Sequence, residues 1–143
     1  MPSITVEALL GGTTVLKRRP RSALEWVELI RRGIPAAAVD SVMRSVRLSQ
    51  AELAVTLGIP ERTLARRKKA GTLSAEESAK LVRLARVAHR AVNVFEAQDI
   101  AIHWLKHPNR ALGGAVPLTL LDTDLGAESV MDVLGRIEHG VFS

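Results

Sequence analysis

The chain has 143 residues, a length that corresponds to one or at most two small domains. It contains no cysteine, which excludes disulfides, thiolate metal sites and cysteine nucleophiles. Apolar residues make up 47% and charged residues 24%, the balance of a globular protein rather than a disordered one. The longest uncharged stretch, residues 111–121, is too short to cross a bilayer, and the start of the chain lacks the pattern of a secretion signal.

The net charge of +5 is distributed unevenly along the chain. Residues 1–90 hold 17 of the 20 Lys and Arg but only eight of the 15 Asp and Glu, a net charge of +9. Residues 91–143 hold three Lys and Arg and seven Asp and Glu, a net charge of −4. A basic front half favours a polyanionic partner, and the acidic rear half predicts a different one.

The composition favours an all-α fold, because Ala, Leu, Arg and Glu dominate and tyrosine is absent. Three serines are each followed three residues later by a glutamate, the pattern of a helix capping box: Ser22/Glu25, Ser49/Glu52 and Ser74/Glu77. Apolar periodicity and these caps predict helices over residues 23–32, 35–46, 50–57, 60 onward, 75–95, 97–106 and 127–139.

Three segments follow from these helices. We expect an N-terminal loop or mobile arm over residues 1–20, where Gly11-Gly12 and Lys17-Arg18-Arg19-Pro20 lie, then a domain over 21–90 and a second over 91–143. The long helix 75–95 is expected to link the two lobes and pack with both. Residues 109–126, which include Gly113-Gly114, are expected to be irregular.

The most specific local pattern spans Gln50 to Arg67. With Gln50 as the first position, Ala54 is fifth, Gly58 ninth and Leu64 fifteenth. Ala54 allows two helices to cross closely, and Gly58 supplies the positive φ of the turn. This spacing resembles DNA-binding helix-turn-helix domains of the phage-repressor (Xre-like) group, whose second helix lies in the major groove.

Arginine can bind guanine through two hydrogen bonds, and lysine or threonine can hold phosphate. The alternative is that the basic run at residues 66–69 is only a solvent-exposed surface without a partner. The helix-turn-helix spacing and the net positive charge of residues 1–90 favour DNA binding instead. Arg67 departs from the helix-turn-helix pattern, because its eighteenth position is usually apolar. This departure predicts that the second helix, the recognition helix, is short or packs in an unusual orientation. The candidate DNA-contacting residues are Gln50, Glu61, Arg62, Thr63, Arg66, Arg67, Lys68 and Lys69.

The rear half contains motifs in a specific order: ESAKLVRLARV at 77–87, AIHWL at 101–105 followed by Pro108-Asn109, ALGG at 111–114, PLTLLDT at 117–123, and Gly126 before a final amphipathic helix. Together with Arg62-Thr63-Leu64, their order and spacing resemble the Xre/MbcA/ParS family of type II antitoxins. The resemblance covers the chain from about Leu24 to Phe142.

The resemblance implies an antitoxin with two tasks and no enzymatic activity, cofactor or metal. The front lobe would bind operator DNA and repress its own operon. The rear lobe would cover the active-site entrance of a cognate toxin that consumes NAD, of the RES type or with an ADP-ribosyltransferase-like fold. We expect a bacterial cytoplasmic protein that forms a homodimer or a larger toxin–antitoxin complex and has no membrane partner.

The rear lobe is rich in apolar residues for its length, and we expect more than half of them to pack internally. The remainder would form the apolar centre of an interface, rimmed by acidic residues that include Glu128 and Asp132 and suit an electropositive pocket for NAD phosphates. The candidate toxin-binding residues are Asn109, Leu112, Pro117, Leu120, Leu121, Asp122, Thr123, Asp124, Glu138, Val141 and Phe142.

Two other functions remain open at this stage. The first is a transcriptional repressor whose rear half dimerises or senses a ligand. The second and weaker is a small metal-dependent enzyme, since four potential ligands fall on one helix face: Glu96, Asp99, His103 and His107. No HExxH motif accompanies them, and histidine near the end of a helix is the more ordinary interpretation.

The remaining candidates for special roles are structural. Ser49 and Ser74 are helix caps rather than nucleophiles, because no GxSxG motif is present. Trp26 and Trp104 lie four residues from Ile30 and Ile100, respectively, and are expected to anchor the core.

Overall fold

The computed structural model describes residues 5–140, and within them the chain forms nine α-helices, two 3₁₀ helices and no β-strand. The expected all-α fold is confirmed. In chain order the elements are α1 (Val6–Leu9), α2 (Gly12–Leu16), α3 (Ala23–Arg32), α4 (Ala37–Val46), α5 (Gln50–Leu57), α6 (Glu61–Ala70), α7 (Ala75–Phe95), α8 (Gln98–Lys106), η1 (Arg110–Leu112), η2 (Pro117–Leu120) and α9 (Asp124–Glu138).

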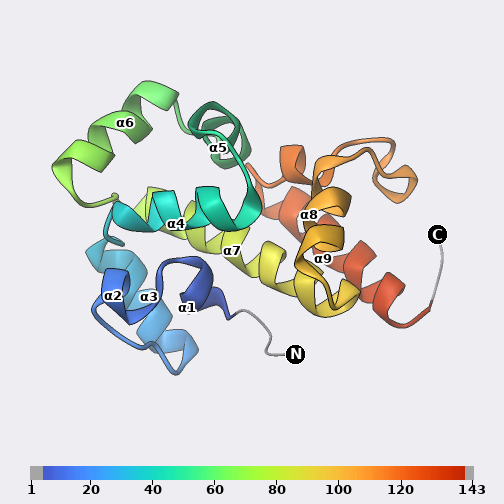
Figure 1. Ribbon diagram of the computed structural model, residues 1–143, viewed down its shortest axis with the longest axis horizontal. Helices are drawn as coiled ribbons and strands as arrows, with labels where there is room; N and C mark the ends of the chain where they lie inside the picture. The colour runs from blue at the N-terminus through green and yellow to red at the C-terminus, as the bar shows by residue number, and fades with distance from the viewer. Residues whose placement is uncertain (1–4, 141–143) are drawn as a thin grey trace.

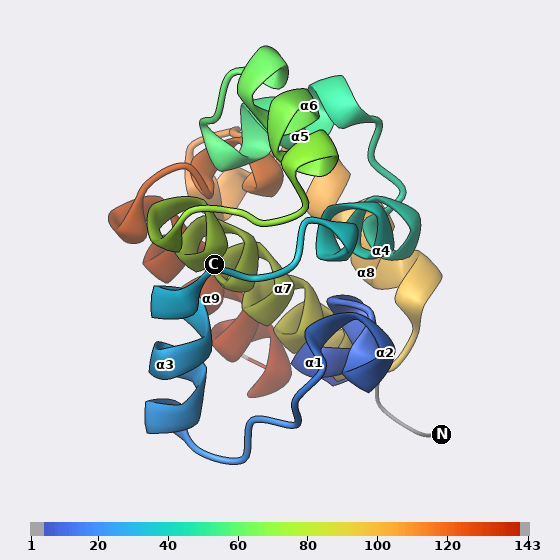
Figure 2. The same cartoon turned by 90° about the vertical axis from the view of Figure 1, so that its left-hand side faces the viewer.

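The long helix α7 is the centre of the molecule. Nine of its 21 residues are buried, and it packs against α1, α3, α4 and α5 of the front half and against α8 and α9 of the rear half. Figure 1 shows it running through the middle of the structure, and Figure 2 shows the other helices arranged around it. The expectation that this helix packs with both lobes is confirmed, and one hydrophobic core serves both.

Serine caps set the starts of the principal helices. Ser49 and Ser74 each accept a hydrogen bond from the backbone N–H of the glutamate three residues on, and each glutamate accepts one from the serine N–H, so both capping boxes are complete. At Ser22 only half of the box forms, because the Glu25 carboxylate accepts from the backbone N–H of Arg21 instead. All three predicted starts are nevertheless correct.

The expectation of a loop or mobile arm at the N-terminus is wrong for residues 5–16. Two short helices form there, and Leu9, Leu10 and Leu16 are at most 2% exposed. α1 packs against α4 and α7, and the hydroxyl of Thr5 caps it by accepting from the N–H of Ala8. Helices of four and five residues are too short to show apolar periodicity, which is why the sequence did not indicate them.

Two smaller expectations are also corrected. Pro35 does not begin a helix; it forms an isolated bridge with Thr72, flanked by the bond from Leu73 N–H to Ile34 C=O (3.0 Å), and α4 starts at Ala37. Ile100 is 55% exposed rather than part of the core. It lies on the outer side of α8, whereas Trp104 is half-buried and packs its ring against Phe95, with centroids 5.8 Å apart.

Candidate DNA-binding and toxin-binding surfaces

The helix-turn-helix consists of α5, the turn at Gly58 and α6. Leu53, Ala54 and Leu57 on α5 are buried, and the N–H of Ile59 donates to Ala54 C=O at 3.0 Å to close the turn. Gly58 has φ +67°, the left-handed conformation that the spacing predicts. Pro60 then precedes α6, which is held to the core through one buried side chain, Leu64.

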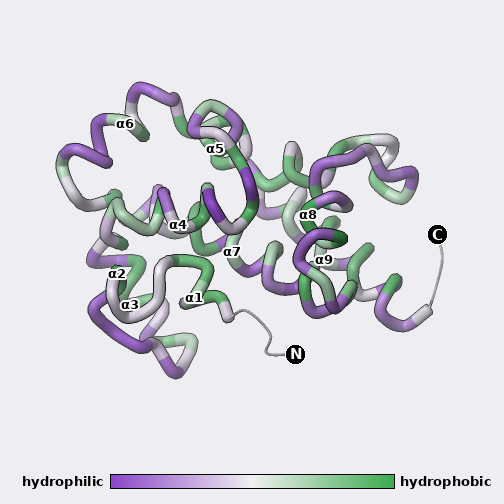
Figure 3. Tube along the Cα trace, in the orientation of Figure 1, coloured by the Kyte–Doolittle hydropathy of each residue, from purple (hydrophilic) through white to green (hydrophobic). Residues whose placement is uncertain are grey.

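The outer face of α6 is basic. Arg62, Arg66 and Lys69 recur at intervals of four and three residues, which places them on one side of a helix, opposite Leu64. All three are exposed, and no ion pair holds any of them among residues 5–140. Figure 3 shows α6 as one of the most hydrophilic segments of the chain, at one extremity of the fold.

Arg67 faces inward, although it is charged. Its Nε donates to Glu77 Oε1 at 2.8 Å, and the Glu77 side chain is only 11% exposed. The same carboxylate accepts from Ser74 N–H in the capping box of α7. Burial raises the pKa of the Glu77 carboxyl, but the bonds from Ser74 and Arg67 outweigh it, so the pKa lies below its usual value of 4.5. α6 is therefore not shortened by Arg67; it runs to Ala70.

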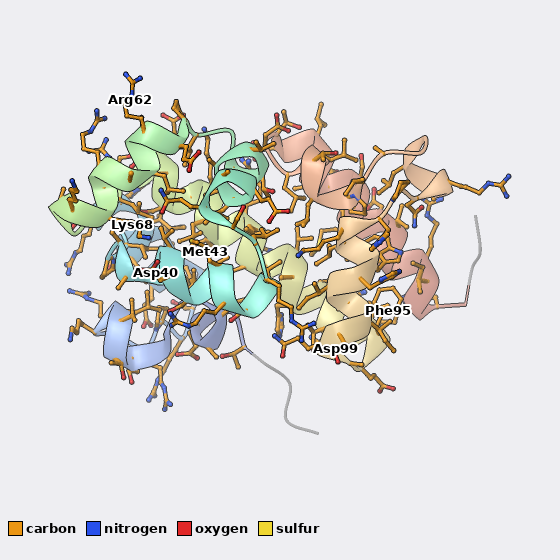
Figure 4. The ribbon with its side chains drawn as sticks, turned by 45° about the horizontal axis from the view of Figure 1, so that its top comes forward. Asp40, Met43, Arg62, Lys68, Phe95 and Asp99 are labelled. Atoms are coloured by element: carbon orange, nitrogen blue, oxygen red, sulfur yellow. The ribbon has the colours of Figure 1, made fainter. Side chains whose placement is uncertain are left out.

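Lys68 is held on the other side of Leu64. Its Nζ lies 2.9 Å from Asp40 Oδ1 on α4 and donates to Gln50 Oε1, 3.1 Å away, at the start of α5. Figure 4 shows Lys68 next to Asp40, whereas Arg62 points outward from the opposite side of α6. The structure thus divides the predicted DNA-contacting residues into two groups: Glu61, Arg62, Arg66 and Lys69 are exposed, and Gln50, Thr63, Arg67 and Lys68 are half-buried.

The segment between α8 and α9, which was expected to be irregular, contains the two 3₁₀ helices η1 and η2. Asn109 closes its first half: its side chain accepts from Ala111 N–H at 2.8 Å, and its backbone N–H donates to Ala115 C=O at 3.0 Å. In the second half, Pro117 and Leu121 are buried beside Leu118. Their side chains fill the core, whereas those of Leu112 and Leu120 are half-buried.

Four of the seven described apolar residues in the predicted set are buried, which confirms that more than half of them pack internally. The buried ones are Pro117, Leu121, Val130 and Leu134, and the half-buried ones are Leu112, Leu120 and Ile137. Val141 and Phe142 lie outside the described residues.

Two of the acidic residues predicted to contact the toxin form ion pairs within the chain. Asp124 pairs with Arg83, which also donates to the C=O of Leu121 at 3.1 Å. Glu138 accepts two hydrogen bonds from the Arg90 guanidinium, at 2.7 and 3.0 Å, and these lower the pKa of its carboxyl. The Asp122 side chain is exposed and forms no ion pair within residues 5–140.

Helix α9 begins three residues earlier than expected, and its first turn carries an exposed residue that is absent from the predicted toxin-binding set. The Thr123 hydroxyl accepts from Gly126 N–H at 3.0 Å and so starts the helix at Asp124. Leu125 then lies in the first turn with 76% of its surface exposed. A threonine cap at position 123 was the available indication. The exposed members of the predicted toxin-binding set are Asp122, Thr123, Asp124 and Glu138, and the first three adjoin Leu125 to form the Asp122–Leu125 corner.

The two lobes meet at the turn of the helix-turn-helix. α5 packs directly against η2, and a Cβ added at Gly58 would lie 3.2 Å from the Cβ of Asp122. Leu48 and Val55 of the front lobe share a shallow groove with Val116 and Leu118 of the rear lobe. The predicted DNA-binding and toxin-binding segments are thus neighbours in the fold.

The residues weighed as metal ligands do not converge. Asp99 pairs with Arg47, Glu96 ends α7, and the rings of His103 and His107 stack on each other with centroids 3.8 Å apart. Across residues 5–140 no group of three or more His, Cys, Asp or Glu side chains is placed to hold a metal ion. Within that same range no helix combines the length and apolar character needed to cross a membrane.

Comparison with known proteins assigns both halves. Residues 25–86 match the antitoxin Xre-like helix-turn-helix domain, and residues 90–140 match the antitoxin Xre/MbcA/ParS C-terminal toxin-binding domain. A chain in the crystal structure of the M. tuberculosis MbcT-MbcA toxin-antitoxin complex has a similar fold, with a TM-score of 0.57 and 24% identity over 76% of this chain and 96% of that one.

Three curated proteins are similar in sequence over most of their length. Antitoxin Xre of Yersinia enterocolitica is 39% identical, with 82% of this chain and 80% of that protein covered. Antitoxin Xre of Photorhabdus laumondii is 36% identical, with 80% and 79% covered. A Sphingobium protein named Prs ADP-ribosylating antitoxin is 27% identical, with 85% and 83% covered. The chain therefore belongs to the Xre antitoxin family, and it is an antitoxin of a toxin–antitoxin system in which a helix-turn-helix domain precedes a toxin-binding domain.

Proposed function

We propose that this antitoxin represses its own operon through α6 and neutralises an NAD-consuming toxin by covering its active-site entrance with the rear lobe. The relative named Prs ADP-ribosylating antitoxin supports a toxin with ADP-ribosyltransferase-like chemistry, and a RES-type toxin is the other member of this class. Neutralisation of this kind is steric and needs no catalytic group on the antitoxin. Both tasks take place in the bacterial cytoplasm.

The observation that carries the DNA-binding half is the exposed basic stripe of Arg62, Arg66 and Lys69 on the second helix of a helix-turn-helix. A single helix of this kind contacts one half-site, so a palindromic operator would take two copies about one helical turn apart. Contacts to phosphate release counterions, and binding should weaken steeply as salt concentration rises.

Fluorescence anisotropy with the DNA upstream of the operon tests this half. Arg66→Ala should weaken operator binding about 10-fold, because an arginine–phosphate contact is lost, and it should leave toxin neutralisation intact. Arg110→Ala, which removes the same charge from the exposed rear loop, is the matched control and should leave the affinity unchanged. Equal binding of the wild-type protein to operator and scrambled DNA would remove the proposed repression.

The toxin-binding half is supported by the Asp122–Leu125 corner, where acidic side chains lie beside an exposed leucine. An apolar side chain surrounded by polar ones is typical of the centre and rim of an interface. A toxin pocket that binds NAD phosphates is electropositive, so acidic residues would complement it and accelerate association.

Co-expression with the toxin, followed by an affinity measurement, tests this corner. Leu125→Ser should weaken toxin binding by about 10-fold or more, as expected for an apolar residue at an interface centre. Leu24→Ser is the matched control, since Leu24 on α3 is also 76% exposed. If both variants neutralise the toxin as well as the wild-type chain does, the corner is not the contact.

A further inference from the structure

Helix α6 has few apolar contacts to fix its orientation. Leu64 is its one buried residue, and its main packing partner is α5. A helix that must present side chains to DNA needs a fixed rotation and tilt, because base contacts depend on placement within a fraction of an ångström. Other interactions must therefore supply what apolar packing does not.

Two charged side chains provide these interactions, one on each side of Leu64. Arg67 binds Glu77 at the start of α7 (2.8 Å), and Lys68 binds Asp40 on α4 (2.9 Å) and Gln50 on α5 (3.1 Å). α6 is thus connected by polar contacts to three separate helices. Glu77 is the most deeply buried of these partners, and its second bond to Ser74 keeps its carboxylate in place.

We propose that Arg67 and Lys68 are positioning residues, which hold the recognition helix in register against α7 and α4, and that they do not themselves contact DNA. The DNA-contacting set is then reduced to the outward-facing residues of α6, with Arg62, Arg66 and Lys69 as its cations. This inference rests on the proposed DNA binding and assigns different roles within the basic run of residues 66–69.

The substitution Glu77→Gln distinguishes the two roles by the sign of its effect. If Arg67 contacted phosphate, removing a negative charge that competes for it would strengthen DNA binding or leave it unchanged. If Arg67 positions α6, Glu77→Gln weakens binding, although the protein becomes more positive. Glu76→Gln is the matched control, because it removes the same charge from the same turn of α7, but Glu76 pairs with Lys80 of α7 and not with a residue of α6.

Operator affinity is measured for the wild-type chain, Glu77→Gln, Glu76→Gln, Arg67→Ala and the Arg67→Ala/Glu77→Gln double variant. We expect Glu77→Gln and Arg67→Ala each to weaken binding about 10-fold and the double variant to be no weaker than either, because paired residues are not additive. Arg67→Ala should also keep the salt dependence of the wild type, whereas Arg66→Ala should reduce the slope by about 0.9, the value for one phosphate contact.

Asp40→Asn provides a second arm that does not depend on the capping box of α7. Asp40 is partly exposed, and its loss should weaken operator binding severalfold while thermal unfolding stays close to that of the wild type. If Glu77→Gln does not fold, this variant decides the question. Binding by Glu77→Gln or Asp40→Asn that equals or exceeds that of the wild type overturns the positioning role. Failure of the wild-type chain to prefer its operator overturns the proposed repression as well.

Discussion

Helices α6 and α7 have almost opposite construction. α7 buries nine of its 21 residues and contacts both lobes, whereas α6 buries one of its ten and depends on charged side chains to join its neighbours. Helix α7 stabilises the whole chain, because the apolar side chains that it buries pack against elements of both lobes. The charged helix gains little stability from its contacts, but they determine which side chains face outward. Substitutions in and around the two helices test this difference.

The largest effect is expected in α7. Leu81 is fully buried, and Leu81→Ala should lower the free energy of unfolding by about 2–5 kcal/mol through lost contacts and a cavity. Because α7 packs with both lobes, operator binding and toxin neutralisation should decline together. Leu64→Ala in α6 is the comparison, and there only operator binding should decline. Denaturant unfolding combined with both binding assays checks the pair, and loss of one activity alone in Leu81→Ala would contradict the central role of α7.

The start of α9 should tolerate no side chain at Gly126. A Cβ at this position would lie 1.8 Å from the C=O of Leu120, so Gly126→Ala must displace η2 or α9 and should cost about 1–3 kcal/mol or more. Gly135→Ala is the control in the same helix, because its nearest atom would be 3.9 Å away. There alanine should raise stability by about 0.8–1.0 kcal/mol through its helix propensity. Thermal unfolding and toxin affinity measure both.

The helix caps should have smaller effects. Ser74→Ala and Ser49→Ala each remove the hydroxyl that accepts from the first turn, at a cost of about 1 kcal/mol in unfolding free energy. We expect Ser74→Ala also to weaken operator binding, because the same glutamate that completes its box holds Arg67, whereas Ser49→Ala should do so less. Equal operator affinity of the two variants would show that the cap of α7 has no particular influence on the position of α6.

The smallest effect concerns acid. The pKa of Glu77 is lower in the folded chain than its usual 4.5, so its ionised form stabilises the fold. This contribution is present above pH 4.5 and is lost as the pH falls through the folded-state pKa. Denaturation midpoints between pH 7 and pH 3 should therefore fall less for Glu77→Gln than for the wild-type chain. An identical decline in both would show that Glu77 contributes nothing to acid sensitivity.

The sequence was sufficient for the elements whose boundaries depend on local chemistry. Ser49 and Ser74 fixed two helix starts, Gly58 fixed the turn, and the order of rear-lobe motifs indicated the family. Contacts between distant residues were not accessible in the same way. The pairing of Arg67 with Glu77 depends on how α6 lies against α7, and a run of four cations gives no indication of which ones face inward.

The short elements were missed for a different reason. α1 and α2 each have fewer than two turns, and the exposure of Leu125 depends on a threonine cap that advanced α9 by three residues. In α1, in α2 and over residues 124–126, the helical segment contains too few residues for apolar periodicity to be recognised.

The close approach of Gly58 to Asp122 limits how this protein can be re-engineered. Exchanging rear lobes between relatives is an obvious route to new toxin specificity. In such a chimera, however, residues 116–122 would come from one parent and would pack against an α5 from the other. A chimera that keeps Leu48 and Val55 from the same parent as Val116 and Leu118 preserves this seam. The practical junction for such a graft therefore follows the packing between α5 and η2 and not the point in the chain where one domain ends.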